Sequence, residues 1–405
     1  MGARGLNSLE ITLITLIMLM ALLTLRVPLY IIMIFVPITS ALTYGGLNFA
    51  TYIITSALSN PTTWGLVSSV AVISVLVSLY SETGVVRRLS LELSNAFRKH
   101  VVAITLTPGI IGLLPVPGGA LMSAPLVDYI GSQIGMSKAK RLFINVWYRH
   151  VIVYVYPLSS VIILASAVTG VGLWDLVIRQ IPVAVAMFLV GLPVLGFSWG
   201  GSRSGVKLGA LARDLTPILV AVVLALVFTP LDGILGVERI SVAFAVTVSI
   251  ALFLVLERVG WNVFLSSLRD RRVWELAIIS FGVMMFRELF LNMDLKPVTG
   301  LLLSYGIDGL LMVVLLPIFF STISGHPTAG IAIATPLITS TMGMDVATAS
   351  LIYASAFIGY IASPLHLCYV YTAQYYNVSL IEGYRYMIPA TLASLTAAIA
   401  ISAIL

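Results

Sequence analysis

Charged residues and cysteines are scarce in this 405-residue chain, and each scarcity removes a class of protein. Only 9% of the residues are charged, whereas an ordinary soluble domain has roughly 25%. A soluble protein could not cover its surface with so few charges. The single cysteine, Cys368, excludes an intrachain disulfide and a cysteine-rich metal site. The sequence also lacks His-Glu-x-x-His, Gly-x-Ser-x-Gly and Walker lysine motifs, so we expect no enzyme, no cofactor and no primary pump.

Hydrophobic residues make up 60% of the chain, and its mean hydropathy is +1.08. This composition predicts an all-α polytopic membrane protein of the cell membrane. The formal charge of +6 then needs no nucleic-acid partner, because cytoplasmic loops are rich in Lys and Arg. A bilayer takes about 20 apolar residues per helix. We expect ten transmembrane helices, over 9–25, 29–44, 64–81, 142–168, 176–198, 214–230, 239–256, 273–291, 346–370 and 384–405.

Two other stretches, 101–136 and 307–343, do not fit a simple span. Each holds two apolar segments of about 11–15 residues, a length more typical of re-entrant than of spanning segments. A break rich in proline and glycine separates the two segments, at Pro115–Gly119 in the first stretch and at Ser324–Gly330 in the second. Because proline removes a backbone donor and clashes with the preceding turn, we expect each stretch to form a re-entrant hairpin.

The charges around the two hairpins differ in sign. Arg98 and Lys138 belong to the basic flanks of the first hairpin, whereas Asp308 and Asp345 flank the second. Since basic loops stay in the cytoplasm, we expect the hairpins to enter from opposite faces. The pattern predicts two inverted-topology repeats, each with three helices, a hairpin and two helices, and with both termini outside. The first repeat, the cytoplasmic linker and the second repeat are expected at 1–198, 199–213 and 214–405.

The two halves also share their proline spacing. Pro157 and Pro364 interrupt the helix after each hairpin and lie 207 residues apart. Pro182 and Pro389 have the same separation, and we expect them to open the last helix of each half. Proline is common in membrane helices, so one such match could arise by chance. Several matches in one order and at nearly one offset indicate an internal repeat.

Broken helices at matching positions of inverted repeats are typical of a transporter's substrate site. Arg149 and His150 lie inside the first interrupted helix. His326 lies at the second hairpin tip, and His366 follows the second helix break. A basic centre with positive helix N-termini favours an anion such as a carboxylate, phosphate or sulfate. Purely structural roles stay open. Arg149 could snorkel toward the membrane surface or pair with Asp128, and each histidine could merely donate a hydrogen bond to a free backbone carbonyl.

The breaks therefore supply the candidate binding residues. The expected substrate is a small organic anion, with a proton or a sodium ion as its coupling partner, and no metal ligand is expected. Residues expected to bind the substrate are Pro117, Gly118, Gly119, Arg149, His150, Ser324, Gly325, His326, Pro327, Thr328, Ser363 and His366. Residues expected to take part in ion coupling are His326, His366 and Asp128.

Two motifs, Ser324–Gly330 and Ser363–Cys368, resemble those of the ion transporter superfamily. That group includes gluconate permeases, four-carbon dicarboxylate carriers and divalent-anion:sodium symporters. The chain looks most like an integral-membrane branch related to them. Pro117–Ala120 and Tyr148–His150 are the first-half counterparts of the two motifs.

The resemblance implies a homodimer in which early helices of each half form a scaffold. The hairpins and broken helices would form a mobile unit that works as an elevator. It also implies secondary transport of an organic anion, driven by sodium or protons. The sodium symporters carry Ser-Asn-Thr at each hairpin tip, and neither tip here has it. This departure and the histidines, which ordinarily titrate at about 6.5, favour protons, with His326 as first choice and His366 as second.

Two other functions stay open. The chain could be an anion exporter or a passive anion pathway. It could also be an intramembrane enzyme that holds a metal with His150, His326 and His366, although no acidic partner for a metal-bound water lies near them in the sequence. The metal content of the purified protein would separate the enzyme from the transporter.

Cysteines introduced at Ser137 and Ser202 are expected to react with an impermeant thiol reagent only from the cytoplasm, because both lie in basic loops. A cysteine at Asp345 is expected to react only from outside, since no Lys or Arg occurs between Lys296 and Arg385. The measurement is labelling of intact cells against inverted vesicles. Labelling of the Ser137 and Asp345 positions from the same face would contradict the inverted repeat.

Overall fold

The computed structural model describes residues 7–96, 100–113, 119–196 and 208–404, and these residues form helices without a strand. The helices are α1 (Ser8–Thr24), α2 (Leu29–Ser59), α3 (Pro61–Glu82), α4 (Val85–Ala96), α5 (His100–Gly112), α6 (Gly119–Gln133), α7 (Lys138–Val153), α8 (Ser160–Thr169), α9 (Leu173–Leu195), α10 (Leu208–Val227), α11 (Pro230–Leu235), α12 (Ile240–Leu256), α13 (Trp261–Arg269), α14 (Arg271–Leu291), α15 (Lys296–Ser304), α16 (Gly309–Ser324), α17 (Pro327–Met342), α18 (Val346–Ala362), α19 (Leu367–Tyr376) and α20 (Leu380–Ile404).

Polar caps and glycines set several of the helix ends. The side chains of Asn7 and Asn60 accept backbone N–H groups at the starts of α1 and α3. Gly170 and Gly325 adopt the left-handed conformation that ends α8 and α16. Short polar or glycine signals therefore stop and restart helices within an otherwise apolar chain.

Six helical segments of the described chain are long and apolar enough to cross a membrane: α2, α3, α9, α10, the unit Val346–Tyr376 and α20. Shorter apolar helices include α1, α5, α8, α12, α16 and α17. The chain is an all-α polytopic membrane protein, as its composition predicts. Each predicted span falls mainly on one helix or, for 142–168 and 346–370, on two helices divided by a break.

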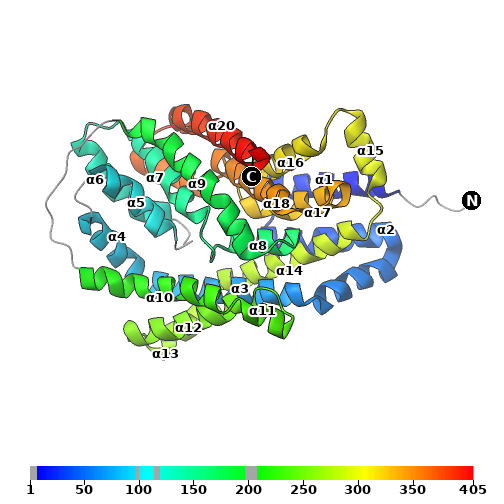
Figure 1. Cartoon of the computed structure of the whole chain (residues 1–405), viewed down its shortest axis with the longest axis horizontal. Helices are drawn as coiled ribbons and strands as arrows, with labels where there is room; N and C mark the ends of the chain where they lie inside the picture. Colours follow the sequence, from blue (N-terminus) through cyan, green and yellow to red (C-terminus); the bar gives the residue numbers. More distant parts are fainter. Residues whose placement is uncertain (1–6, 97–99, 114–118, 197–207, 405) are drawn as a thin grey trace, which may run out of the picture.

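Figure 1 shows the helices in two layers. The first layer consists of α2, α3, α10, α12 and α14, which pack on one another in the lower part of the view. The second layer consists of α5 to α9 and α16 to α20, which pack together above it. The layers meet, among other places, where α8 contacts α3 and α14 and where α17 contacts α14.

The helices of the two halves interlock within the second layer. Both predicted stretches fold as pairs of packed helices, α5 with α6 and α16 with α17, and their re-entrant course in a membrane stays a prediction. Each hairpin also contacts the other half, since α6 packs on α19 and α17 packs on α8. α8 begins at Ser160 and α19 at Leu367, 207 residues later, and α9 and α20 are offset by the same number. These agreements support the internal repeat, while the opposite orientation of the halves in a membrane stays a prediction.

The predicted span 29–44 is too short. α2 continues to Ser59 through a kink at Gly45 and Gly46, and Gly46 has a φ of +68°, which glycine adopts without strain. Beyond the kink, threonine hydroxyls bond carbonyls of the preceding turn, as Thr51 does to Leu47. Polar residues that satisfy themselves within the helix allow it to extend past the apolar run.

Further predicted boundaries are also wrong. Pro182 and Pro389 do not open the last helix of each half but lie nine residues after the first residue of α9 and α20. Proline is tolerated inside a membrane helix because neighbouring groups satisfy the freed carbonyl. The linker is shorter than 199–213, because α10 begins at Leu208, and the rest of it lies outside the described residues. The short helices α4, α11, α13 and α15 are additional to the predicted elements.

A group of ion pairs joins α4, α10 and the end of α12. The buried Asp214 carboxylate accepts two hydrogen bonds from Arg88, at 2.6 and 2.7 Å. The same guanidinium donates to Glu257 at 2.7 Å, and Arg213 donates to Glu257 at 2.8 Å. Burial alone raises the pKa of Glu257, but the hydrogen bonds from Arg213 and Arg88 outweigh it and hold that pKa below its ordinary value. Glu257 is therefore ionised at neutral pH and keeps the group paired.

Asp214→Asn is expected to lower the free energy of unfolding by about 2 kcal/mol, because it removes a charged acceptor of two hydrogen bonds from Arg88. The melting temperature in detergent measures this loss. Glu275→Gln is the control, since it removes the partner of the exposed Arg271 and should change stability by less than about 0.5 kcal/mol. Equal destabilisation by the two substitutions would show that the Asp214–Arg88 pair does not contribute to the stability of the fold.

Candidate functional site

The four basic side chains predicted to bind the substrate lie in the second layer. Arg149 and His150 stand near the end of α7, just before the break at Tyr154–Ser159, and each is 4% exposed. His326 is partly buried and caps α17 at the second hairpin tip. His366 occupies the N-cap position of α19 without a side-chain cap bond and is fully buried. The predicted basic residues therefore stand at helix breaks inside the protein rather than at its surface.

The three histidines gather around Tyr360, on the last turn of α18. The ring centroid of Tyr360 lies 4.1 Å from that of His366 and 6.0 Å from that of His326. The centroids of His150 and His366 are 4.7 Å apart. The structure thus brings together residues that are up to 216 positions apart in the sequence. Tyr360 itself escaped the sequence analysis, because nothing local distinguishes it from other tyrosines of apolar helices.

The three imidazoles differ in their hydrogen bonds. Nδ1 of His150 lies 2.6 Å from the Val146 carbonyl, and since a carbonyl only accepts, Nδ1 carries the proton and Nε2 keeps a lone pair. Nδ1 of His326 accepts the Thr328 N–H at 3.3 Å, so this nitrogen carries no proton. Neither ring nitrogen of His366 makes a hydrogen bond of ordinary geometry within the described chain, although a backbone carbonyl lies near the ring.

The second hairpin tip packs directly against the second helix break. Gly325 has a φ of +65°, and a Cβ there would lie 2.7 Å from the Leu365 carbonyl oxygen, so glycine is required. The Ser363 hydroxyl donates to the Thr322 carbonyl at 2.5 Å and accepts the Leu365 N–H at 3.1 Å. The Ser363 hydroxyl therefore uses its hydrogen bonds within the protein, where it joins the hairpin tip to the helix break. Of the predicted tip residues, Gly325 lies against Leu365 and His326 against Tyr360. Ser324 and Thr328 are hydrogen-bonded to His326, and Pro327 begins α17.

The first hairpin contributes less to the described site. Pro117 and Gly118 lie outside the described residues, and Gly119 begins α6. The Asp128 carboxylate pairs with Arg141 at 2.6 Å. Arg141 lies eight residues, or about 12 Å, before the buried cation of α7. The structure therefore does not bring Asp128 to the histidines, and its role in ion coupling stays a prediction.

A buried amide links the two halves behind the histidines. Asn145 of α7 accepts a hydrogen bond from the Ser123 hydroxyl of α6 at 2.6 Å. Its amide N–H donates to the Ala120 carbonyl at 2.8 Å and to the Thr372 hydroxyl of α19 at 3.3 Å. One amide within an apolar helix forms no motif, so the sequence analysis missed it. Its position four residues before Arg149, on the same helix face, is the signal that could have found it.

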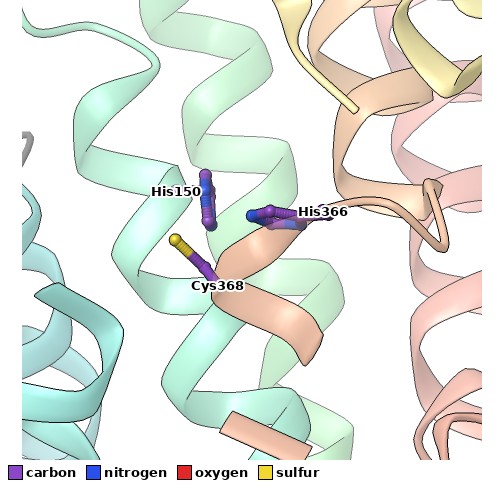
Figure 2. A group of neighbouring side chains, drawn as sticks. All are labelled: His150, His366 and Cys368. Carbon is purple, nitrogen blue, oxygen red and sulfur yellow. The ribbon is translucent and has the colours of Figure 1, made fainter. Parts of the chain in front are cut away.

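Figure 2 shows His150 of α7 beside His366 and Cys368 at the start of α19. One imidazole nitrogen of each histidine and the Cys368 Sγ all lie within 4.8 Å of one another. The Tyr360 hydroxyl is in hydrogen-bonding contact with the same sulfur. The metal-binding group expected from the sequence had His326 as its third member, whereas the structure places Cys368 there. A histidine followed two residues later by the only cysteine was the available signal.

Comparison with known proteins identifies the family. Residues 6–405 match the family described as "Protein of unknown function (DUF401)". The chain belongs to the DUF401 family. No functionally curated protein matches this DUF401 chain.

The DUF401 chain has the fold of two solved transporters. The Alcanivorax borkumensis YdaH transporter is similar with a TM-score of 0.62 and 12% identity, over 88% of this chain and 89% of that one. Neisseria gonorrhoeae MtrF, described as illuminating a class of antimetabolite efflux pumps, is similar with a TM-score of 0.58 and 12% identity, over 88% and 84%. At this identity the likeness shows the fold alone. Neither comparison names the ion transporter superfamily, so that assignment stays a prediction.

Proposed function

We propose that this protein is a secondary active transporter of a small organic anion, most simply a carboxylate. The observation that carries the proposal is the buried basic centre at which broken helices of both halves meet. Arg149 is 4% exposed and interacts electrostatically with His366 and Tyr360. A buried arginine in a membrane protein is costly and usually marks a substrate or ion path. The likeness of the fold to two transporters supports transport rather than catalysis.

Open helix N-termini add to this centre. α8 begins after Ser159 and α19 begins after His366, and neither helix has a side-chain cap. The first N–H groups of a helix and the positive end of its dipole suit a carboxylate. Broken helices of transporters present such N-termini to anionic substrates. The anion would therefore be held by a guanidinium and by backbone donors, which together make charge-assisted hydrogen bonds.

We also propose that the coupling ion is a proton and that His326 carries it. Nδ1 of neutral His326 caps α17 by accepting the Thr328 N–H. A proton taken up at Nδ1 would displace this bond and leave the Thr328 N–H to the anion. The titratable neighbours of His326 are Tyr360, whose ring faces it, and His366, which interacts with it electrostatically. Proton and anion would then bind cooperatively, each raising the affinity of the other by the same factor.

The motion and the direction of transport are part of the proposal. The second layer would move against the first as an elevator within a homodimer of the ion transporter superfamily. The few helices that join the layers, chiefly α3, α8, α14 and α17, support such a movement. An exporter is the second candidate, because MtrF, which has the same fold, is described among antimetabolite efflux pumps. Proteoliposomes loaded or surrounded with the anion would distinguish uptake from export.

Arg149→Gln is expected to weaken anion binding about tenfold to a hundredfold, because losing one charge-assisted contact costs about 1.5–3 kcal/mol. The measurement is a thermal-shift screen of carboxylates, phosphate and sulfate, followed by titration of the best ligand. Arg258→Gln is the matched control, since Arg258 is exposed after the end of α12. Equal, small effects of the two substitutions would make Arg149 a structural residue.

His326→Gln is expected to abolish uptake driven by a pH gradient without sodium, while anion binding at fixed pH persists with a lower affinity, because the cooperative effect of the proton is lost. Glutamine keeps a polar side chain at the cap of α17 but cannot carry the proton. Uptake into proteoliposomes is measured with a pH gradient alone and with a sodium gradient alone. His100→Gln, at the start of α5, serves as the control. Uptake that follows only the sodium gradient and is unchanged in His326→Gln would refute proton coupling.

A further inference from the structure

The trio of His150, His366 and Cys368 has features of a metal site that anion transport does not explain. The Nδ1–H of His150 donates to the Val146 carbonyl, which fixes the ring and leaves Nε2 as a possible ligand. Metal-binding histidines almost always donate their second nitrogen to a carbonyl or carboxylate in this way. His366 is fully buried, and neither of its ring nitrogens makes a hydrogen bond of ordinary geometry among the described residues, although the Ile361 carbonyl lies near the ring. Such a poorly satisfied imidazole is costly to bury, and a bound ion would satisfy it.

Cys368 completes a nitrogen–nitrogen–sulfur set. It is the second residue of α19, where the positive end of the helix dipole favours a thiolate. The contact with the Tyr360 hydroxyl still leaves the sulfur with lone pairs for a metal. One nitrogen of each imidazole and the Cys368 Sγ lie within 4.8 Å of one another. Metal–ligand distances of about 2.0–2.3 Å would draw these atoms together by roughly 1 Å, which side-chain rotation can supply.

We propose that His150, His366 and Cys368 bind one Cu⁺ ion between α7 and α19. Thiolate and imidazole ligands suit both Cu⁺ and Zn²⁺, so charge and ligand number decide between them. Cu⁺ with a thiolate adds no net charge to this buried place, whereas Zn²⁺ would add one positive charge close to the Arg149 guanidinium. Zn²⁺ also prefers four ligands, and the described group offers three.

The ion would connect the two halves of the chain at their breaks. His150 belongs to the broken helix of the first half, and His366 and Cys368 belong to that of the second. A bound Cu⁺ would therefore hold α7 against α19. This inference does not depend on the proposed transport, because the ion can be bound and measured without any anion.

The test is an anaerobic titration of the purified, full-length protein with Cu⁺ against the chromophoric chelator bicinchoninate. We expect one Cu⁺ per chain. Cys368→Ser and His366→Gln should each lower the affinity by at least about tenfold, since even outer partners of metal ligands change affinity by 10–100-fold. His326→Gln is the matched control and should leave the affinity unchanged, because His326 lies at the same centre but outside the trio. X-ray absorption of the wild-type protein should show one sulfur and two nitrogens around copper.

Size-exclusion chromatography would show whether a variant fails to fold. In that case, the X-ray absorption spectrum of the wild-type protein still tests the proposal. Absence of Cu⁺ binding by the wild-type protein would overturn the proposal. So would a copper shell without sulfur, or equal binding by a folded double variant, Cys368→Ser with His366→Gln. Tighter binding of Zn²⁺ than of Cu⁺ in direct competition would overturn the assignment of the ion.

Discussion

Every helix that stops inside a membrane protein leaves backbone groups that lipid cannot satisfy, and covering them is the constraint that organises this fold. The second hairpin tip and the second helix break cover each other. Gly325 lets the tip lie against the Leu365 carbonyl, Ser363 binds the Thr322 carbonyl, and His326 caps α17. The polar side chains around Tyr360 therefore lie together because the hairpin tip and the helix break cover each other's backbone groups. The same closeness places imidazoles, a guanidinium and a thiol within reach of a ligand.

Two groups of charged and basic side chains differ in their environment. Arg88, Asp214 and Glu257 form a paired group that joins α4, α10 and the end of α12, where opposite charges offset the loss of water. The basic centre of the second layer has a different balance, because Arg149 stands among imidazoles. The paired group stabilises the protein as it is, and the basic centre is the place where the proposed anion would bind.

Local signals predicted much of the fold. Apolar length predicted the spans, and Pro157 and Pro364 predicted the two broken helices, because proline disrupts a helix wherever it lacks compensation. Proline gave wrong helix starts at Pro182 and Pro389, where packing compensates for the lost backbone hydrogen bond and the helices continue. The kink at Gly45–Gly46 was also missed.

The candidate site was predicted only in part, because its composition depends on contacts between distant segments. The buried histidines could be found from their position beside the breaks. The partner of Asp128 could not, since Arg141 and Arg149 both follow it on the next helix and only packing selects Arg141. Asn145 and Cys368 carry no motif at all, and they matter only because α7 and α19 are neighbours in space.

The interlocked hairpins have a consequence for how the protein is made. α6 packs on α19 and α8 packs on α17, so the surfaces that the first half must cover are supplied about 200 residues later in synthesis. Chains generally acquire structure from the N-terminus as they emerge from the ribosome. Here the first half would wait in the bilayer with the Asn145 amide and the start of α8 lacking their final neighbours. Newly made chains would therefore depend on lipid, water or a membrane chaperone to protect these groups until the second half arrives.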